Sequence, residues 1–420
     1  TNYRPINLAS VPAKVMEQIL KDNVQGHLTT HQLISKSQHG FVPGRSCTSN
    51  LLEHMNNVTR ALDSGQNFDT ILLDFKRAFD KVPFRHMLAK VKSHGIGGRV
   101  LKWIEDWTRG RKQRVVLNGE HSSLIDVTSS VVQGSVLGPI LFGIFINDLD
   151  ISISEAVNDV FISKFADDTK LGKAITKPSD CYVRQEALDK LCQWTDRWGM
   201  ELHPDKCVVL HFGSSNPTHD YVINGIKIMA TDSARDLGVT ISDSGGTTEH
   251  VNNIAKKAHG VLSQMKRTLT YRDSRTFTRI YRTYVRPILE SSVQAWNPSK
   301  VEDVNTLEKV QRRALRMVTD QGDANYETKL LNIGMTTLQA RRQRGDMIQV
   351  YKLMNDMSGL DKSDYFNFVQ ERHSKETRSY CDNLLVPEKC HINLRKNYFS
   401  CRVVNAWNAL PIEVRESVSV

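Results

Sequence analysis

A fully buried strand is the strongest fold signal in this sequence. The run DTILLDF, from Asp69 to Phe75, is short, almost entirely apolar and rich in aliphatic residues. Such a run is typical of a strand covered on both faces, because a strand with one face in water alternates apolar and polar residues. The strand ends in an acid, Asp74, which a buried strand seldom carries without a cause. The sequence thus predicts a covered sheet with an acidic group at its edge.

Helices and strands alternate around this run through the first 245 residues, and beyond that point the chain is mostly helical and more basic. The predicted order is helices at 12–35 and 50–64, the strand at 69–75, a helix between Pro83 and Gly95, a hairpin turning at Asn118-Gly119, an apolar helix at 139–149, a hairpin carrying 165–170, a helix at 180–198, and strands in CVVLHFG and YVINGIKI. The fold class is therefore α/β (α+β), with a helical C-terminal part.

The composition bounds the cellular setting. Lys and Arg number 56 against 46 Asp and Glu, and the pI of about 9.2 suggests a polyanionic partner such as nucleic acid. The seven cysteines are odd in number and scattered, which favours free thiols in a reducing compartment. The most apolar run, Val136 to Ile146, is about half the roughly 20 residues that cross a bilayer, so we expect a buried helix and no membrane. No secretory signal opens the chain, and we expect an intracellular protein.

Two adjacent carboxylates, Asp167 and Asp168, lie in the segment FADDTK. Like charges repel, but a pair of aspartates at a hairpin turn becomes favourable when divalent cations lie between them. Two such ions about 3.5–4 Å apart activate a hydroxyl and stabilise a leaving phosphate. Asp74 is the best candidate for a third ligand on a neighbouring strand. For the dipeptide alone, the competing interpretation is an Asp pair that caps a turn.

Several segments, in order, resemble the reverse transcriptase of non-LTR (LINE-type) retrotransposons, most closely the Jockey-like and related clades. NYRPINLASVPAKVMEQIL and QHGFVPGRSCTSNLL resemble the fingers motifs, and ILLDFKRAFDKV, VVQGSVLGPILFGIFINDL and FADDTKL resemble three palm motifs. WGMELHPDKCVVLHFG and RDLGVTI resemble the fourth palm motif and the primer grip. The resemblance covers nearly the whole chain, which begins inside the first fingers motif.

The resemblance implies a role for individual residues. Asp74, Asp167 and Asp168, with the backbone carbonyl of Phe75, would hold two Mg²⁺ ions, with Mn²⁺ as a substitute. Residues implied to bind the incoming dNTP are Arg4 at the triphosphate, Phe79 beneath the sugar, and Gln133 and Gly134 beside the base or sugar. Lys206 would donate a proton to departing pyrophosphate.

Each of these side chains also has an ordinary structural interpretation. Phe79 suits a core position, and Gln133 with Gly134 suits a loop before a helix. Lys206 suits a solvated strand edge. The segment LHPDK, residues 202–206, departs from the family, which more often has asparagine near His203 to Asp205. This departure bears on nucleotide placement and leaves the metal site untouched.

From Lys256 to Arg286 the chain is strongly basic, with Asp273 as its one acid. Apolar residues recur at helical spacing there, which predicts a helix with one apolar stripe and a basic remainder. The residues predicted to contact nucleic acid are Arg45, Lys256, Lys257, Lys266, Arg267, Arg279, Arg282 and Arg286. The alternative is a solvated helix face.

Residues 301–420 carry apolar residues at helical spacing and resemble the segment that follows the polymerase in these elements. Cys381, Cys390, His391 and Cys401 raise the possibility of zinc, but the spacing C-x8-C-H-x9-C matches neither a zinc knuckle nor a zinc finger. No cluster of acids here suggests ribonuclease H. We expect a small helical domain.

Together these features predict a right-hand polymerase with a palm of split βαββαβ type, a helical fingers remnant, a helical thumb and a helical C-terminal domain. The expected boundaries are 1–68 for partial fingers, 69–245 for the palm, 246–300 for the thumb and 301–420 for the last domain. The expected function is RNA-templated DNA synthesis in retrotransposition, with an RNA template, a DNA primer and dNTPs as partners. An endonuclease domain is expected elsewhere in the full element, and a ribonucleoprotein in cytoplasm and nucleus.

Two other functions remain open at this point. The chain can be a truncated, catalytically silent remnant that only binds RNA, because part of the fingers is missing. It can also be an RNA-templated RNA polymerase, although the ring of Phe79 opposes a 2′-hydroxyl.

Overall fold

The computed structural model of this chain describes residues 7–368, 384–417 and 419. The predicted site residue Arg4 and the zinc candidate Cys381 lie outside the described residues. The chain forms two compact units, the first made of Thr1–Ser46, Asp69–Val209 and Pro217–Ala230, and the second of Cys47–Phe68, Leu210–Asn216 and Thr231–Val420.

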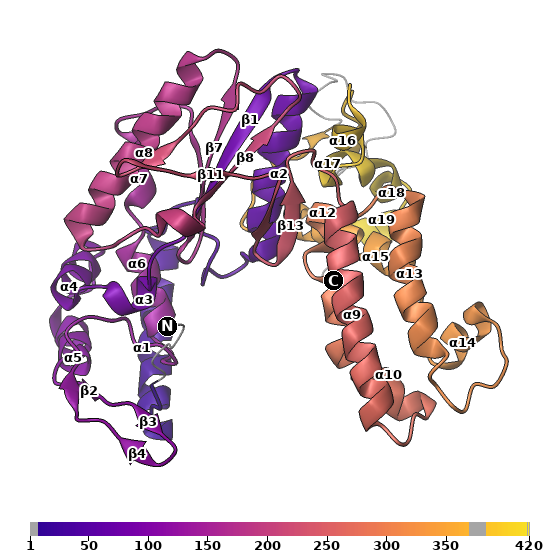
Figure 1. Cartoon of the computed structure of the whole chain (residues 1–420), viewed down its shortest axis with the longest axis horizontal. Coiled ribbons are helices and arrows are strands. Elements are labelled where there is room, and N and C mark those ends of the chain that lie inside the picture. Colours follow the sequence, from indigo (N-terminus) through magenta and orange to yellow (C-terminus); the bar gives the residue numbers. More distant parts are fainter. Residues whose placement is uncertain (1–6, 369–383, 418, 420) are drawn as a thin grey trace. The chain divides into compact units, whose positions relative to one another are not determined.

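A five-stranded sheet has the strand order β11-β8-β1-β7-β6 (Figure 1), and most of its residues belong to the first unit. Its strands are β1 (Asn67–Leu73), β6 (Phe161–Phe165), β7 (Asp168–Ile175), β8 (Val208–Phe212) and β11 (Met229–Ala230). Helices separate β1 from the β6–β7 hairpin, and the long helix α8 separates β7 from β8. This chain order, combined with the spatial order β8-β1-β7-β6, is the split βαββαβ arrangement and confirms the predicted palm topology. The short strand β11 extends the sheet, parallel to β8.

The buried run is confirmed as a strand, although β1 covers 67–73 rather than 69–75. Five of its seven residues are buried, and it lies between two neighbours. The other elements of the first unit are the helices α1 (Val11–Thr30), α3 (Ala78–Lys81), α4 (Phe84–Ser93), α5 (Gly98–Thr108), α6 (Gly138–Phe145), α7 (Leu149–Ser154), α8 (Ser179–Trp198) and η1 (Pro204–Lys206), and the strands β2 (Lys112–Gln113), β3 (Val116–Leu117), β4 (Glu120–His121), β5 (Ile125–Asp126), β9 (Val222–Ile223) and β10 (Ile226–Lys227). The predicted turn at Asn118-Gly119 joins β3 to β4, and both of its residues have positive φ, as a two-residue hairpin requires.

Helix α6 is the apolar helix predicted from the sequence, and it lies inside the core of the first unit. It ends at Phe145 rather than at residue 149, and α7 begins separately at Leu149. Asn147 lies in this break and uses its side chain on another segment: its Oδ1 accepts from the Ser35 N–H at 2.8 Å, and its Nδ2 donates to the Leu33 carbonyl at 2.7 Å. Nowhere in the described part of the chain is a helix both long and apolar enough to cross a bilayer.

The second unit is mainly helical. Its elements are α2 (Cys47–Asp63), β12 (Ser233–Asp236), β13 (Val239–Ser242), α9 (Thr248–Thr268), α10 (Ser274–Tyr284), α11 (Arg286–Glu290), α12 (Val293–Trp296), α13 (Val301–Leu315), α14 (Tyr326–Asn332), α15 (Leu338–Met354), η2 (Lys362–Asp364), β14 (Asn367–Phe368), β15 (Leu385–Val386), α16 (Asn393–Lys396), α17 (Phe399–Arg402), α18 (Val404–Asn408) and α19 (Ile412–Arg415). The predicted apolar stripe of α9 is buried, including Ile254, Ala258 and Met265. Helix α2 groups with this unit, whereas the sequence placed it in one fingers segment with residues 1–46.

Candidate active site

The β6–β7 hairpin carries the two adjacent aspartates at its tip. Phe165 pairs with Asp168, so Ala166 and Asp167 form a two-residue turn. Ala166 has φ of 56°, a left-handed conformation that a tight hairpin needs and that a residue with a side chain adopts at a cost. Asp167 is half-buried and Asp168 is exposed. The turn therefore presents two carboxylates at one edge of the sheet.

Asp74 follows the last residue of β1, and β1 is the sheet neighbour of β7. Its backbone is held by the segment that resembles the fourth palm motif. The Asp74 carbonyl accepts from the His203 N–H at 2.9 Å, and the Asp74 N–H lies 3.4 Å from the Sγ of buried Cys207. Burial raises the pKa of the Cys207 thiol to about 11, so this group stays protonated near neutral pH. Asp74 thus lies just beyond the end of a strand that neighbours the hairpin, and its role as a third ligand stays a prediction.

The three aspartates have the hard oxygen donors that Mg²⁺ prefers. Across residues 7–368, 384–417 and 419, however, no three or more His, Cys, Asp or Glu side chains are grouped so that they could hold a metal ion. The donor atoms fit the chemistry of Mg²⁺, but the carboxylates do not form a finished cage. Carboxylates that are brought together without a cation repel one another. The assignment of Asp74, Asp167, Asp168 and the Phe75 carbonyl to metal ligands stays a prediction.

Phe79 lies five residues after Asp74, in the segment that follows β1, and its ring is only partly buried. It stacks on Phe142 of α6 with the ring centroids 4.3 Å apart and the planes 14° apart. Phe41 contacts the same ring edge-on at 6.4 Å. Because Phe142 is fully buried, it provides a rigid base for the Phe79 ring. The core thus holds the Phe79 ring in place. Both interpretations of Phe79, as a core residue and as the ring beneath the sugar, require this.

The loop before α6 carries Gln133 and Gly134. Nε2 of the Gln133 side chain donates to Oδ1 of Asp80 at 2.8 Å, and Asp80 is the residue that follows Phe79. Gly134 has φ of 90°, which favours glycine. Sequence reasoning missed the contribution of Glu17, a buried acid of α1 whose Oε2 accepts from the N–H groups of Val136 and Leu137 at 2.6 and 3.2 Å.

The structure places two further predicted residues, Lys206 and Arg45, in different surroundings. Lys206 is exposed at the end of η1, next to Cys207, which contacts Asp74. Arg45 points into its own loop, where its Nη1 donates to the carbonyls of Lys36 and of Gln38, the latter at 2.7 Å. That contact favours a structural role for this nitrogen, and nucleic-acid binding by Arg45 stays a prediction.

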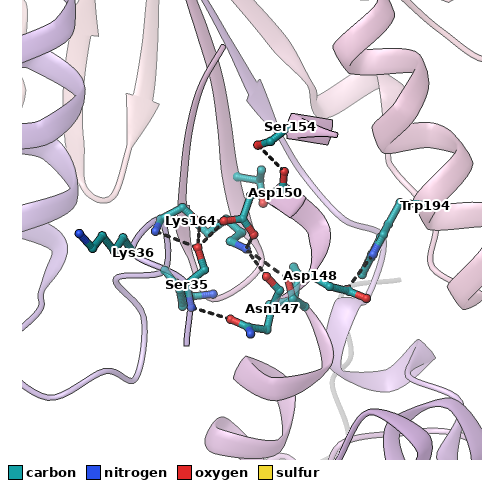
Figure 2. Close-up of polar contacts among 12 residues, drawn as sticks. Ser35, Lys36, Asn147, Asp148, Asp150, Ser154, Lys164 and Trp194 are labelled. Atoms are coloured by element: carbon teal, nitrogen blue, oxygen red, sulfur yellow. Dashed lines mark hydrogen bonds and ion pairs between the residues drawn. The ribbon is translucent and has the colours of Figure 1, made fainter. Parts of the chain in front are cut away.

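A buried polar network, missed by the sequence reasoning, includes Lys164 of the β6–β7 hairpin (Figure 2). Lys164 of β6 is fully buried and its ammonium contacts the Asp150 carboxylate at 2.6 Å and the carbonyls of Ile146 and Asn147. Ser35 and Ser37 donate to the other oxygen of Asp150. The one signal in the sequence was a lysine inside the short segment FISKF, three residues before Asp167.

Burial and neighbouring charges both shift the pKa values of the ionisable groups in this network. Burial lowers the pKa of Lys164, against the opposing effect of the nearby Asp150 charge. Burial alone would raise the pKa of Asp150, but the Lys164 charge and the hydrogen bonds from Lys164, Ser35 and Ser37 outweigh it and lower that pKa. Beside this pair, Lys90 contacts Asp148 and lies 3.7 Å from the centroid of the Trp198 ring. Burial lowers the pKa of Lys90 to about 8, although Asp148 acts in the opposite direction.

The basic residues predicted to bind nucleic acid lie in the second unit, apart from Arg45. Lys256, Lys257, Lys266, Arg267, Arg279 and Arg282 are exposed, and Arg286 is half-buried. Arg282 donates to the carbonyls of Ile333 and Gly334, and Arg286 pairs with Glu290 at 3.6 Å. The exposed side chains of α9 and Arg279 are therefore better placed for phosphate contacts than these two.

The described residues give no support to a zinc site that includes Cys390, His391 and Cys401. Cys390 and Cys401 lie with their Sγ atoms 3.4 Å apart. His391 pairs with Asp63 instead, at 3.3 Å. Among the described residues, which include Cys390, His391 and Cys401, no three His, Cys, Asp or Glu side chains are grouped so that they could hold a metal ion.

Comparison with known proteins gives one family and several relatives. Residues 1–241 match the family described as reverse transcriptase (RNA-dependent DNA polymerase). The RNA-directed DNA polymerase from mobile element jockey of Drosophila funebris is 26% identical over 332 residues, and that of Drosophila melanogaster is 25% identical over 329 residues. Each match covers 76% of this chain and 36% of the relative, so the chain spans little more than a third of their length.

A solved structure is similar to this chain at low sequence identity. An apo telomerase from Candida tropicalis matches with a TM-score of 0.46 and 8% identity, over 81% of this chain and 55% of that chain. A TM-score at that level carries no argument about fold or function.

Proposed function

Because this chain belongs to the reverse transcriptase (RNA-dependent DNA polymerase) family, we propose that it extends the 3′-hydroxyl of a DNA primer with dNTPs on an RNA template. The observation that supports the proposal best is the sheet order of the first unit. The strand followed by Asp74 and the strand that begins at Asp168 are direct neighbours there. Residues far apart in the chain thus carry carboxylates on neighbouring strands of one sheet.

Asp74, Asp167 and Asp168, with the carbonyl of Phe75, would hold two divalent cations, Mg²⁺ or in its place Mn²⁺. When bound, such a pair of cations activates an attacking hydroxyl and stabilises charge on the transferring and leaving phosphates. The chain's own contribution is to hold the three carboxylates on rigid elements and to orient primer and dNTP for in-line attack. Lys206, exposed beside the segment that holds Asp74, would supply a proton to the leaving pyrophosphate.

The dNTP would lie against Phe79, Gln133 and Gly134, with Arg4 at its triphosphate. The stacking of Phe79 on the buried ring of Phe142 supports this assignment, since a steric filter works only if the ring cannot retreat. A ring beneath the sugar leaves no space for a 2′-hydroxyl and so favours deoxynucleotides.

Phe79→Ala should therefore weaken the preference for dNTPs over rNTPs. We expect the ratio of kcat/KM for dATP over ATP to fall at least about tenfold, through faster use of ATP. Phe79→Tyr keeps the ring and serves as the matched control, with a nearly unchanged ratio. A preference that survives Phe79→Ala would return this residue to an ordinary core position.

The second unit would contact the template–primer duplex through the exposed cations of α9 and α10. Such contacts bind phosphates without reading sequence, and each one steepens the dependence of affinity on salt. The triple variant Lys256→Gln, Lys257→Gln and Arg279→Gln should lower the slope of log Kd against log salt by about 2–3, because each lost phosphate contact removes roughly 0.7–0.9.

Fluorescence anisotropy with an RNA–DNA hybrid at several salt concentrations measures this slope. Lys352→Gln is the matched control, since Lys352 is exposed on α15 and lies outside the predicted contact residues, and it should leave the slope nearly unchanged. Equal slopes for the triple variant and the wild type would refute the duplex contact.

The second candidate function is RNA binding without synthesis. The absence of a ready metal-ligand group among the described residues is the observation that favours it. Extension of a labelled DNA primer on an RNA template, with dNTPs and Mg²⁺ or Mn²⁺, separates the two. Longer products support the polymerase, whereas tight RNA binding with no product supports the silent binder. In the full element, the protein would act as a ribonucleoprotein in cytoplasm and nucleus, with an endonuclease domain elsewhere.

A further inference from the structure

The loop Ser37–Gly40 runs along the strand that leads into the aspartate turn. Gln38 pairs with Lys164 in a parallel bridge. The His39 N–H donates to the Lys164 carbonyl and the Lys164 N–H donates to the Ser37 carbonyl, both at 2.7 Å. The loop therefore acts as a short additional strand at the free side of β6, and it belongs to the same compact unit.

The side chain of Gln38 reaches from this loop to the turn itself. It is fully buried, and its Oε1 accepts from the N–H of Ala166 at 3.0 Å and from the N–H of Gly40 at 2.8 Å. Its Nε2 lies 3.5 Å from the carbonyl of Ala166. Both polar groups of the Ala166 backbone are thus engaged by one side-chain amide. Ala166 is also the residue with the unfavourable positive φ.

Gly40 brings the two segments into direct contact. A Cβ at this position would lie 2.3 Å from the Ala166 nitrogen and 3.0 Å from the Phe165 carbonyl carbon, distances that backbone atoms do not permit. Only glycine therefore allows the loop to approach the turn so closely.

The loop is itself fixed at its other end by the polar network of Figure 2. Ser35 and Ser37 donate to Asp150, and Asp150 pairs with Lys164, so the strand and the loop share one buried carboxylate. Two side chains that precede Gln38 are thus tied to the same carboxylate as Lys164.

We infer that Gln38 is a positioning residue that holds Ala166 in its left-handed conformation and thereby sets where Asp167 presents its carboxylate. The inference rests on the proposed function and deepens it. An amide suits the task because one oxygen accepts from two N–H groups while the nitrogen faces a carbonyl. A displacement of about 1 Å at such a site is enough to slow a reaction about a hundredfold.

Gln38→Met tests this inference, because methionine has a similar length and volume and lacks the amide. The N–H of Ala166 would lose its acceptor, and its hydrogen–deuterium exchange should become about tenfold faster or more. In the chain without nucleic acid, Mn²⁺ titration followed by electron paramagnetic resonance should show a half-saturation about tenfold higher. Gln18→Met, the same change at an exposed position of α1, is the control and should alter neither measurement.

Three outcomes would overturn the inference. The first is exchange at Ala166 that stays at the wild-type rate in Gln38→Met. The second is faster exchange at Ala166 with an unchanged Mn²⁺ half-saturation. The third is a lower melting temperature with unchanged Mn²⁺ half-saturation, which is what a purely structural role produces. Wild-type protein that exchanges as expected but extends no primer counts against the proposed function and leaves the contact between Gln38 and Ala166 supported.

Discussion

Asp167→Asn should slow primer extension on an RNA template by about 10³-fold or more, because a metal ligand in such a site contributes several kcal/mol to the transition state. Asparagine keeps the volume of aspartate and removes only the charge. Asp167 is half-buried at a turn rather than in the core, so the unfolding free energy should change by about 1 kcal/mol or less. The measurement is the single-turnover rate, paired with thermal unfolding of the same preparation.

Asp106→Asn is the matched control for this experiment. Asp106 is an exposed acid on α5, so the same loss of one negative charge should leave the rate within about twofold of the wild type. A rate for Asp167→Asn within about threefold of the wild type would refute the metal assignment.

Lys164→Met should destabilise the first unit by about 3–5 kcal/mol, the largest effect on stability that we expect in this chain. Lys164 is fully buried, and the side chain of its partner Asp150 is only 14% exposed. Removing the ammonium leaves a buried carboxylate without its counter-charge. Urea unfolding of the variant and the wild type at pH 7 gives the difference in unfolding free energy.

A second substitution separates the lost charge from the lost packing. Lys164→Met combined with Asp150→Asn removes both charges and keeps an oxygen that accepts from Ser35 and Ser37, so part of the stability should return. Lys112→Met is the control, because the Lys112–Asp126 pair is exposed and contributes about 1 kcal/mol or less. If Lys164→Met costs no more than Lys112→Met, the buried pair is not a determinant of stability.

The effect of Lys164→Met should also depend on pH. The folded-state pKa of Asp150 lies below its ordinary value, so the pair contributes stability above that ordinary value. The contribution is lost as the pH falls through the lowered pKa. The difference in unfolding free energy between wild type and variant should therefore shrink in acid.

Local patterns in the sequence determined the elements. The apolar run that became β1, the apolar helix α6, the Asn118-Gly119 hairpin and the apolar stripe of α9 were all predictable, because side-chain periodicity and turn chemistry act over a few residues. The split βαββαβ sheet was predicted with the help of the family resemblance, and the strand order confirms it. The paired aspartates and a third acid could be nominated from the same patterns.

Only the tertiary structure decided what holds those acids. Gln38 and Ala166 are 128 residues apart, and Asp74 and Cys207 are 133 apart, so no periodicity relates them. The partnership of Lys164 with Asp150 spans two elements and depends on both side chains losing water together. Hydrogen bonds between distant segments are selected by the packed fold, because a buried polar group must take whichever partner the surrounding chain brings to it. Sequence patterns were thus sufficient to identify the acids. The amide, the lysine and the glycine that support them became apparent only in the folded chain.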